Sequence, residues 1–349
     1  MSFTPPRCPS LACPKHRTPD GFRYIRWGYF SARCRLRREQ RYRCMECRKT
    51  FSRQTFRHDY RDRRPEINGK LFSLLTSGVG FRQAASLLDV DQATAQNKMH
   101  KMSRTCGLLH HNLSTELPTG REYLLDEEES YEQASIRPLT VPILIERTSY
   151  FVVASAVGSI RRLAPVGTVR RRRQELEEKK CGKRPDQSRQ CVAQVMRALR
   201  QRTTGSIVLC TDQKSSYATL AREVFGADVV HETTPGSAPR TTFNRLFPIN
   251  LSIAMSRDNC GRLRRRSWLV SKLAKRLEGQ LEIFTVYRNY VRPRTRRSSK
   301  NQTPAYLLGL LPRQLNVPEA LRWRQDWELR SIHPMSSCGL RAIGDLPLK

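Results

Sequence analysis

The 349-residue sequence predicts a multidomain α/β protein. Three observations support this prediction: two close cysteine pairs lie near the N-terminus, a segment with helical periodicity follows, and β-branched runs then alternate with helical segments. Hydrophobic residues make up 38% of the chain, which is enough to build a sizeable core. We expect domains at residues 1–60, 61–115 and 120–311, followed by a C-terminal tail at residues 312–349.

Basic residues dominate the charge balance. The chain has 64 Lys and Arg against 31 Asp and Glu, a formal net charge of +33. Such an excess attracts polyphosphates, because each neutralised phosphate releases condensed counterions. A single run such as Arg170–Arg173 is equally compatible with a solvated basic face. For a whole chain this basic, a nucleic acid is the favoured partner.

No segment predicts a membrane span or secretion. The longest apolar stretch, Tyr150–Ile160, is much shorter than the roughly 20 residues of a spanning helix. The N-terminal residues lack the apolar segment of a signal peptide. We therefore expect a cytoplasmic or nucleoid-associated protein, or a nuclear one if the host is eukaryotic. In such a compartment the 11 cysteines favour metal ligation or buried thiols over disulfides.

Two close cysteine pairs, CPSLAC and CMEC, predict a structural zinc site. Close pairs on two turns can place four thiolates at the corners of a tetrahedron, and metal binding then supplies folding free energy that a small module lacks. The segment between the pairs predicts short aromatic-rich strands, so we expect a zinc ribbon. The expected ligands are Cys8, Cys13, Cys44 and Cys47. Cys34 is a competing ligand, and His16 is a weaker one.

The pattern becomes helical from Glu66 onward, where Leu71, Leu74 and Leu75 form an apolar stripe. Further along, Phe81–Leu88 predicts a short helix and Gln92–Met102 a second one, with a tight turn between them. This order is typical of a helix-turn-helix, whose second helix enters the DNA major groove. The alternative is an ordinary helical hairpin packed on a core.

The exposed face of the second helix is the expected site of base contacts. Gln and Asn side chains can pair with adenine, and Lys can reach phosphate or guanine. The candidate residues are Gln92, Thr94, Gln96, Asn97 and Lys98.

The central part of the chain alternates strands and helices. Residues 121–130 predict a strand that carries Asp126 at its C-terminal end, and two apolar β-branched runs follow as the second and third strands. A basic stretch, residues 161–185, is expected to be rich in loops before a helix at Gln187–Arg202. A strand at Ile207–Cys210 and a further helix come next. This order is that of an RNase H-like fold with a mixed-sheet catalytic core.

Two separated aspartates are the candidate catalytic groups. In an RNase H-like fold the first and fourth strands lie side by side, so Asp126 would meet Asp212, which comes just after the fourth strand. Paired carboxylates repel unless a divalent cation neutralises them, and magnesium favours a few carboxylates together with waters and phosphates. A pair of such ions can promote in-line phosphoryl displacement. The alternative is that each Asp is only a turn former.

Four ordered motifs resemble blocks of insertion-sequence DDE transposases. VLCTDQKSSY resembles the second-aspartate motif, and LLDEEESYEQASIRPLTVPILIE is similar to the first-aspartate strand and its hairpin. FPINLSIAMSRDNCGRLRRRSW resembles the basic block before the third acid, and NQTPAYLLGL resembles the closing Thr-Pro-Ala motif. With the zinc ribbon and the helix-turn-helix, the resemblance spans roughly Cys8 to Leu311.

The resemblance implies a transposase that binds the terminal repeats of a mobile element. In that family an acidic triad, with magnesium, cuts DNA and joins it to a target. The implied partner is double-stranded DNA, with the protein a homo-oligomer on it. The basic block adds the candidate DNA contacts Arg262, Arg264, Arg265 and Arg266.

The third acid departs from the family pattern. The position where the family carries its Glu is occupied by Lys275, and an ammonium group cannot ligate magnesium. Glu278 lies on the same predicted helix face three residues later, and we expect it to complete a magnesium site with Asp126 and Asp212. Glu282 and Asp258 are alternatives. A decayed transposase that only binds DNA is the other interpretation.

Overall fold

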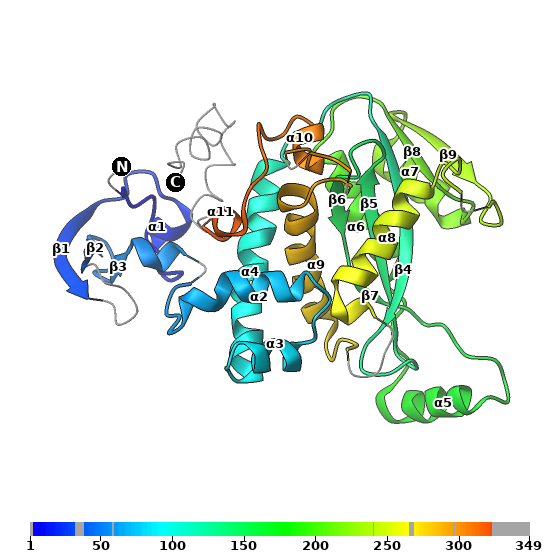
Figure 1. Ribbon diagram of the computed structural model, residues 1–349, viewed down its shortest axis with the longest axis horizontal. Coiled ribbons are helices and arrows are strands. Elements are labelled where there is room, and N and C mark those ends of the chain that lie inside the picture. The colour runs from blue at the N-terminus through cyan, green and yellow to red at the C-terminus, as the bar shows by residue number, and fades with distance from the viewer. Residues whose placement is uncertain are drawn as a thin grey trace.

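The structure of the chain is a computed structural model that describes residues 3–31, 38–57, 59–239, 241–264, 269–295, 297–299 and 301–322. A small N-terminal module lies beside a larger body in which helices surround a sheet (Figure 1). The strands are β1 (Tyr24–Ser31), β2 (Arg38–Cys44), β3 (Thr50–Ser52), β4 (Glu122–Tyr131), β5 (Pro138–Glu146), β6 (Val152–Ser155), β7 (Gly158–Ser159), β8 (Ile207–Asp212) and β9 (Val229–Thr234).

The described α-helices are α1 (Pro14–Arg17), α2 (Asn68–Leu75), α3 (Phe81–Leu87), α4 (Gln92–Leu113), α5 (Val169–Cys181), α6 (Ser188–Arg200), α7 (Ser215–Phe225), α8 (Phe247–Asn259), α9 (Ala274–Val286), α10 (Pro304–Leu307) and α11 (Val317–Leu321). Short 3₁₀ turns occur at η1 (Arg53–Phe56), η2 (Pro65–Ile67) and η3 (Gly261–Leu263), and η4 (Tyr287–Val291) is a π-helical turn.

The N-terminal module contains an antiparallel sheet in the order β1-β2-β3. Its core is small and aromatic: Tyr42, Phe51 and Phe56 are buried together with three of the four paired cysteines. Tyr42 stacks on Phe51 with ring centroids 5.9 Å apart. The predicted aromatic-rich strands are therefore present, and so few apolar side chains agree with a module that needs a metal to fold.

The predicted pair of helices is present as α3 and α4. The turn between them places Asp89 in the left-handed region, with φ of 50°. Ala84 and Ala95 are fully buried where the helices pack, so small side chains allow the close approach that the sequence predicted. Helix α4 continues well beyond Met102 and has 22 residues.

The main sheet has six strands and is mixed. Its order is β6-β5-β4-β8-β9, with β7 also paired to β5. Strands β4 and β8 are parallel neighbours, as expected for the strands that carry the two aspartates. Strand β4 extends to Tyr131, so Asp126 lies in the middle of the strand rather than at its end. The extra length comes from antiparallel pairing with β5, which continues after the pairing with β8 has stopped at Leu124.

Helices cover both faces of this sheet. Tyr123 and Leu125 of β4 pack in the cluster that includes α6 and α7, whereas Leu124 packs in the cluster that includes α8. Every residue of β5 is buried, in agreement with a central strand covered on both faces. The expectation of a loop-rich segment at residues 161–185 is wrong in one respect, because this segment contains the projecting helix α5 (Figure 1).

One hydrophobic core joins the predicted helix-turn-helix region to the sheet. The largest cluster includes Leu71 of α2 and Met99 of α4 as well as Leu209 of β8. Residues beyond 311 also contribute, since Leu315 and Leu321 are buried in the same cluster. The region predicted as a tail therefore begins as packed structure, and residues 323–349 lie outside the described part of the chain.

Helices α4 and α9 approach each other closely because glycines lie at their contact. A β-carbon on Gly279 of α9 would lie 3.3 Å from the Met99 sulfur and 3.1 Å from the Ser103 hydroxyl oxygen of α4. A β-carbon on Gly107 of α4 would lie 3.2 Å from the Glu282 carboxylate of α9. Larger side chains at these two positions would push the helices apart.

Side chains satisfy backbone groups of β6 at the edge of the sheet. Asn289 donates from Nδ2 to the carbonyl oxygen of Val152 at 2.8 Å, and its Oδ1 accepts from the Val152 amide at 2.9 Å. The Nε2 atom of His110 lies 3.0 Å from the carbonyl oxygen of Val153. Asn289 is fully buried.

Among the described residues, no helix is both long and apolar enough to cross a membrane.

Candidate functional site

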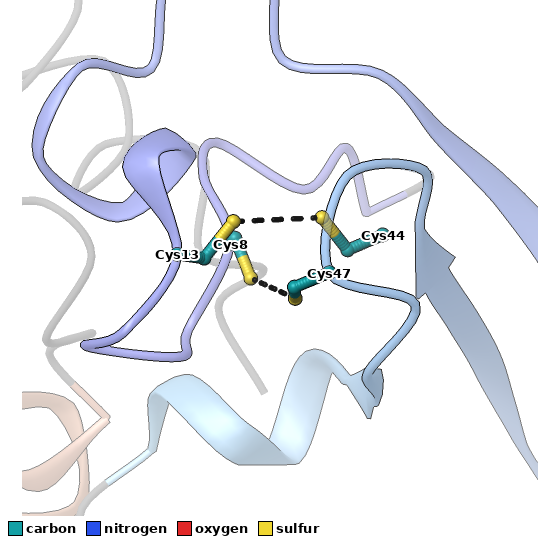
Figure 2. Close-up of side chains that lie close together, drawn as sticks. All are labelled: Cys8, Cys13, Cys44 and Cys47. Atoms are coloured by element: carbon teal, nitrogen blue, oxygen red, sulfur yellow. Dashed lines mark hydrogen bonds between the residues drawn. The ribbon is translucent and has the colours of Figure 1, made fainter.

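Four cysteine sulfurs converge in the N-terminal module (Figure 2). The Sγ atoms of Cys8 and Cys47 are 3.5 Å apart, those of Cys13 and Cys44 are 3.9 Å apart, and all four lie within 4.8 Å of one another. Zinc–sulfur bonds of about 2.3 Å place the sulfurs of a regular tetrahedron about 3.8 Å apart. The cluster is therefore compatible with a structural zinc site held by the four predicted cysteines.

Local backbone geometry presents these thiols to one another. Cys13 is the N-cap residue of α1, and Cys44 ends β2 at a tight turn in which Arg48 adopts φ of 58°. The Nδ1 atom of His16 lies within hydrogen-bonding distance, 2.8 Å, of the carbonyl oxygen of Cys8. This imidazole therefore contacts the backbone and is not part of the sulfur cluster. Cys34, the other competing ligand, lies outside the described residues.

A second site is a pocket of about 480 Å³ lined by residues of β4, β5 and β8 and of the segments that follow them. Asp126 of β4 and Asp212 of β8 both line this pocket. The two strands are in parallel register with Leu124 opposite Cys210, so each aspartate lies two residues beyond a paired position. The structure therefore brings the two predicted carboxylates to one site.

Glu127, which was not among the predicted site residues, organises one wall of this pocket. Its carboxylate accepts hydrogen bonds from Lys214 at 2.5 Å, Thr140 at 2.6 Å and Tyr217 at 2.9 Å. Burial, followed by the nearby Glu127 and Asp126 carboxylates, raises the pKa of Tyr217, so its hydroxyl stays protonated and donates. The signal available in the sequence was the acidic run around Asp126, which cannot show that strand alternation aims Glu127 at α7.

Basic side chains form part of the rim of the same pocket. Arg161, Arg162 and Lys214 line it together with Glu129 and Asp186. Each of the three cations is held by a carboxylate: Arg161 by Glu178, Arg162 by Glu129 and Lys214 by Glu127. Mixed charge of this kind can accept metal ions on the carboxylates and phosphate oxygens on the rim.

Glu278 is not among the residues that line the pocket of Asp126 and Asp212. It lies on α9 with a pKa raised by burial, a shift that nearby Lys275 opposes. Within the described ranges, the four cysteines form the only group of three or more Cys, His, Asp or Glu residues close enough to share a metal. The expected trio of Asp126, Asp212 and Glu278 is therefore not assembled in this structure.

The two alternative third acids also lie elsewhere. Glu282 lines a separate pocket of about 270 Å³ with Arg202, and burial raises the pKa of Glu282 to about 7. The Asp258 side chain is 83% exposed and lies 3.6 Å from Arg264. Neither residue lines the pocket of the two aspartates.

The candidate DNA contacts on α4 differ in their exposure to solvent. Gln92 and Asn97 are exposed, and Thr94 and Gln96 are half-buried. The expectation for Lys98 is wrong, because its amine is buried and donates to Asp62 Oδ2 at 3.0 Å and to Asn68 Oδ1 at 2.9 Å. The physical reason is helical periodicity: position 98 lies one turn after buried Ala95, so it faces inward.

The basic block is also partly internal. Arg262 was expected to contact DNA, but it is 7% exposed and its guanidinium lies over the Phe81 ring of α3 at 4.5 Å. Burial, assisted by Arg276, lowers the pKa of Arg262 to about 10, which leaves it charged at neutral pH. Arg264 is half-buried and donates to the carbonyl oxygen of Asp258. Arg265 and Arg266 lie outside the described residues.

The chain was compared with known protein families and with curated proteins. No family model matches it, and no curated protein matches it.

Replacing Cys44 and Cys47 together by Ser should remove bound zinc and unfold the N-terminal module. Two ligands of one tetrahedral site are lost, and the module's small aromatic core cannot replace the folding energy of the metal. Elemental analysis of purified protein should give about one zinc per chain for wild type and none for the variant. Cys181→Ser is the matched control, because Cys181 is exposed on α5 and far from the cluster in sequence. Equal zinc content in wild type and in the Cys44/Cys47 double variant would contradict the assignment of these cysteines as zinc ligands.

Replacing Lys98 by Met should destabilise the fold instead of weakening DNA binding. The change leaves buried Asp62 with one ammonium partner fewer, and breaking a buried ion pair costs about 3–5 kcal/mol. Lys101 also pairs with Asp62, but its side chain is 37% exposed, so Lys101→Met should cost less, about 1 kcal/mol or below. Urea denaturation measures both. A large loss of DNA affinity in folded Lys98→Met protein would instead support a direct contact.

Proposed function

We propose that the chain is a DNA strand-transfer enzyme of the DDE transposase type. In this proposal residues 1–60 are a zinc ribbon, α3 and α4 form a helix-turn-helix, and the six-stranded sheet is the core of an RNase H-like catalytic region. The observation that carries the proposal is the position of Asp126 and Asp212 on neighbouring parallel strands, in one pocket with a basic rim.

The pocket suits metal-dependent phosphoryl transfer. Asp126 and Asp212 would hold magnesium, which supplies a Lewis acid for the attacking and leaving oxygens of an in-line displacement. The rim cations Arg161, Arg162 and Lys214 would bind the phosphate backbone of the DNA and orient it over the two carboxylates. Glu127 keeps Lys214 and Tyr217 in place beside them.

The N-terminal half of α4 suits recognition of the element ends. Gln92 and Asn97 are exposed on this helix, and amide side chains can read adenine in the major groove. The net charge of +33 favours phosphate contacts that place the helix on the duplex. The proposed partner is double-stranded DNA, bound by more than one copy of the chain.

A second candidate function is DNA binding without catalysis. The observation that favours it is that none of the expected third acids reaches the pocket: Lys275 occupies the family's acid position, and neither Glu278, Glu282 nor Asp258 lines the pocket. In the enzyme proposal, a bound DNA duplex brings the third acid toward Asp126 and Asp212, since catalytic geometry often tightens only in the substrate complex. Glu278 therefore stays a prediction.

Asp126→Asn and Asp212→Asn should each abolish magnesium-dependent cleavage of the element ends and leave duplex binding intact. An amide keeps the shape of the side chain but loses the charge that holds a divalent ion. Cleavage of a labelled duplex and a binding titration measure the two properties separately. Glu282→Gln is the control, because Glu282 lines the other pocket and should cut like wild type.

Three outcomes of this cleavage experiment separate the two functions. Loss of cutting in both Asp variants but not in Glu282→Gln supports the enzyme. Cutting by either Asp variant at the wild-type rate contradicts it. An inert wild type that cuts only after Lys275→Glu identifies a decayed enzyme that retains DNA binding.

Gln96→Ala combined with Asn97→Ala should weaken binding to the preferred sequence by about 10-fold or more and leave binding to random DNA nearly unchanged. A good base contact discriminates by about 1–3 kcal/mol, whereas non-specific affinity comes from phosphate contacts elsewhere. Competition titrations at one fixed salt concentration measure the ratio. Arg82→Ala, on the exposed side of α3, is a control that should lower both affinities alike. Equal losses in the double variant would remove Gln96 and Asn97 from base recognition.

A further inference from the structure

Arginine side chains stack on aromatic rings along one surface of the N-terminal module. Arg43 lies over the Trp27 ring at 4.4 Å, Arg41 lies over Phe30 at 5.3 Å, and Arg61 lies over Tyr60 at 5.4 Å. The stacked-arginine surface is defined by these residues: Trp27, Phe30, Tyr60, Arg41, Arg43 and Arg61.

This surface is separate from the aromatic core of the module. Along β2, Arg41 and Arg43 alternate with Tyr42, whose ring packs inward on Phe51. Because successive side chains of a strand point to opposite faces, both arginines lie on the outer face of the sheet. Arg43 is also directly opposite Ile25 of β1, which is 40% exposed.

The outer face continues into a groove of about 430 Å³. Phe30 and Arg41 line it from the sheet, and Tyr60 and Arg61 line it from the segment that leads to α2. Its two acidic residues are engaged: Asp59 pairs with Arg57, and Asp62 pairs with Lys98 and Lys101. The groove therefore presents aromatic rings and cations to solvent.

The aromatic rings of Trp27 and Tyr60 are exposed to solvent, and a bound partner would explain this exposure. Trp27 is 45% exposed even with Arg43 stacked on it, and Tyr60 is 37% exposed. The rings do not support the core, and Lys and Arg far outnumber Asp and Glu in residues 1–60. Aromatic rings in a positively charged groove, with Trp27 and Arg43 on the sheet face beside it, fit a ligand that has both flat apolar faces and negative charges.

We propose that the stacked-arginine surface binds single-stranded DNA, with unpaired bases stacked on Trp27 and Tyr60 and phosphates bound by the arginines. A duplex hides the faces of its bases within the helix, so only an unpaired strand can use both features. The choice of DNA as the nucleic acid rests on the proposed function. Strand cleavage and joining at element ends would supply such unpaired segments.

The test measures binding of a labelled oligothymidylate and of a matched duplex to the full zinc-loaded chain, in magnesium-free buffer without chelator. Trp27→Ala should lower the affinity for the single strand about 10-fold, in the range expected for loss of one base stack, and affect the duplex little. Trp27→Phe should recover most of the loss, because a ring remains. Arg43→Lys should bind less tightly than wild type although the charge is kept, because the planar stack is lost.

Phe243→Ala is the control for general loss of an exposed ring, because Phe243 is 96% exposed at another part of the chain. Its affinity for both DNAs should equal wild type. Unchanged zinc content in each variant shows that the module is folded. An unchanged single-strand affinity in Trp27→Ala overturns the proposal, and so does an equal loss for single strand and duplex. Magnesium-dependent cleavage is not needed for this readout, so failure here is distinguishable from failure of the proposed enzyme.

Discussion

The close packing of α4 on α9 is the constraint on which the rest of the structure depends. Gly279 and Gly107 let the two helices touch, and Met99, Met102 and Leu109 of α4 are fully buried as a result. One end of α4 carries the candidate base-contacting side chains, and its other end packs within the same hydrophobic cluster as the sheet. The segment that would recognise DNA is therefore part of the main core. If the proposed function holds, the cut would fall at a set distance from the recognised sequence, because α4 packs in one hydrophobic cluster with the strands that carry the two aspartates.

Strand alternation places Glu127 and Glu129 on one face of β4 and Glu128 on the other, so the acidic run has several different partners. Asp126 lines the pocket, and Glu127 binds Lys214 and Tyr217 at its wall. Glu128 is buried on the opposite side, where it accepts from Ser256 at 2.9 Å and from Arg257 at 2.5 Å. Glu129 pairs with Arg162. The like charges of Glu127, Glu128 and Glu129 are tolerated because each of these three carboxylates has its own cationic or hydroxyl partner.

Much of the fold could be predicted because its signals are local. The apolar run that becomes β5 and the turn at Asp89 both follow from short-range patterns. Helix α5 was missed because it has no apolar stripe; Thr168 caps its first turn and the Arg171–Glu175 ion pair supports it. The burial of Arg262 could not be predicted, since it depends on Phe81, a partner far along the chain. Helical periodicity accounts for the inward position of Lys98, but its ion pair with Asp62 depends on tertiary packing. The position of the expected third acid was also not predictable, because tertiary packing keeps both Glu278 and Glu282 of α9 out of the lining of the pocket of the two aspartates.

The buried Asn289 side chain has a consequence for how the protein can associate with other chains. An edge strand normally offers a row of free amide and carbonyl groups, and a further strand from another molecule can bind there. At β6 the amide and carbonyl of Val152 are already bound by Asn289, and His110 contacts the next carbonyl. A second copy or an extended peptide therefore cannot lengthen the sheet across Val152, and assembly on that side must use side-chain surfaces instead of shared strands.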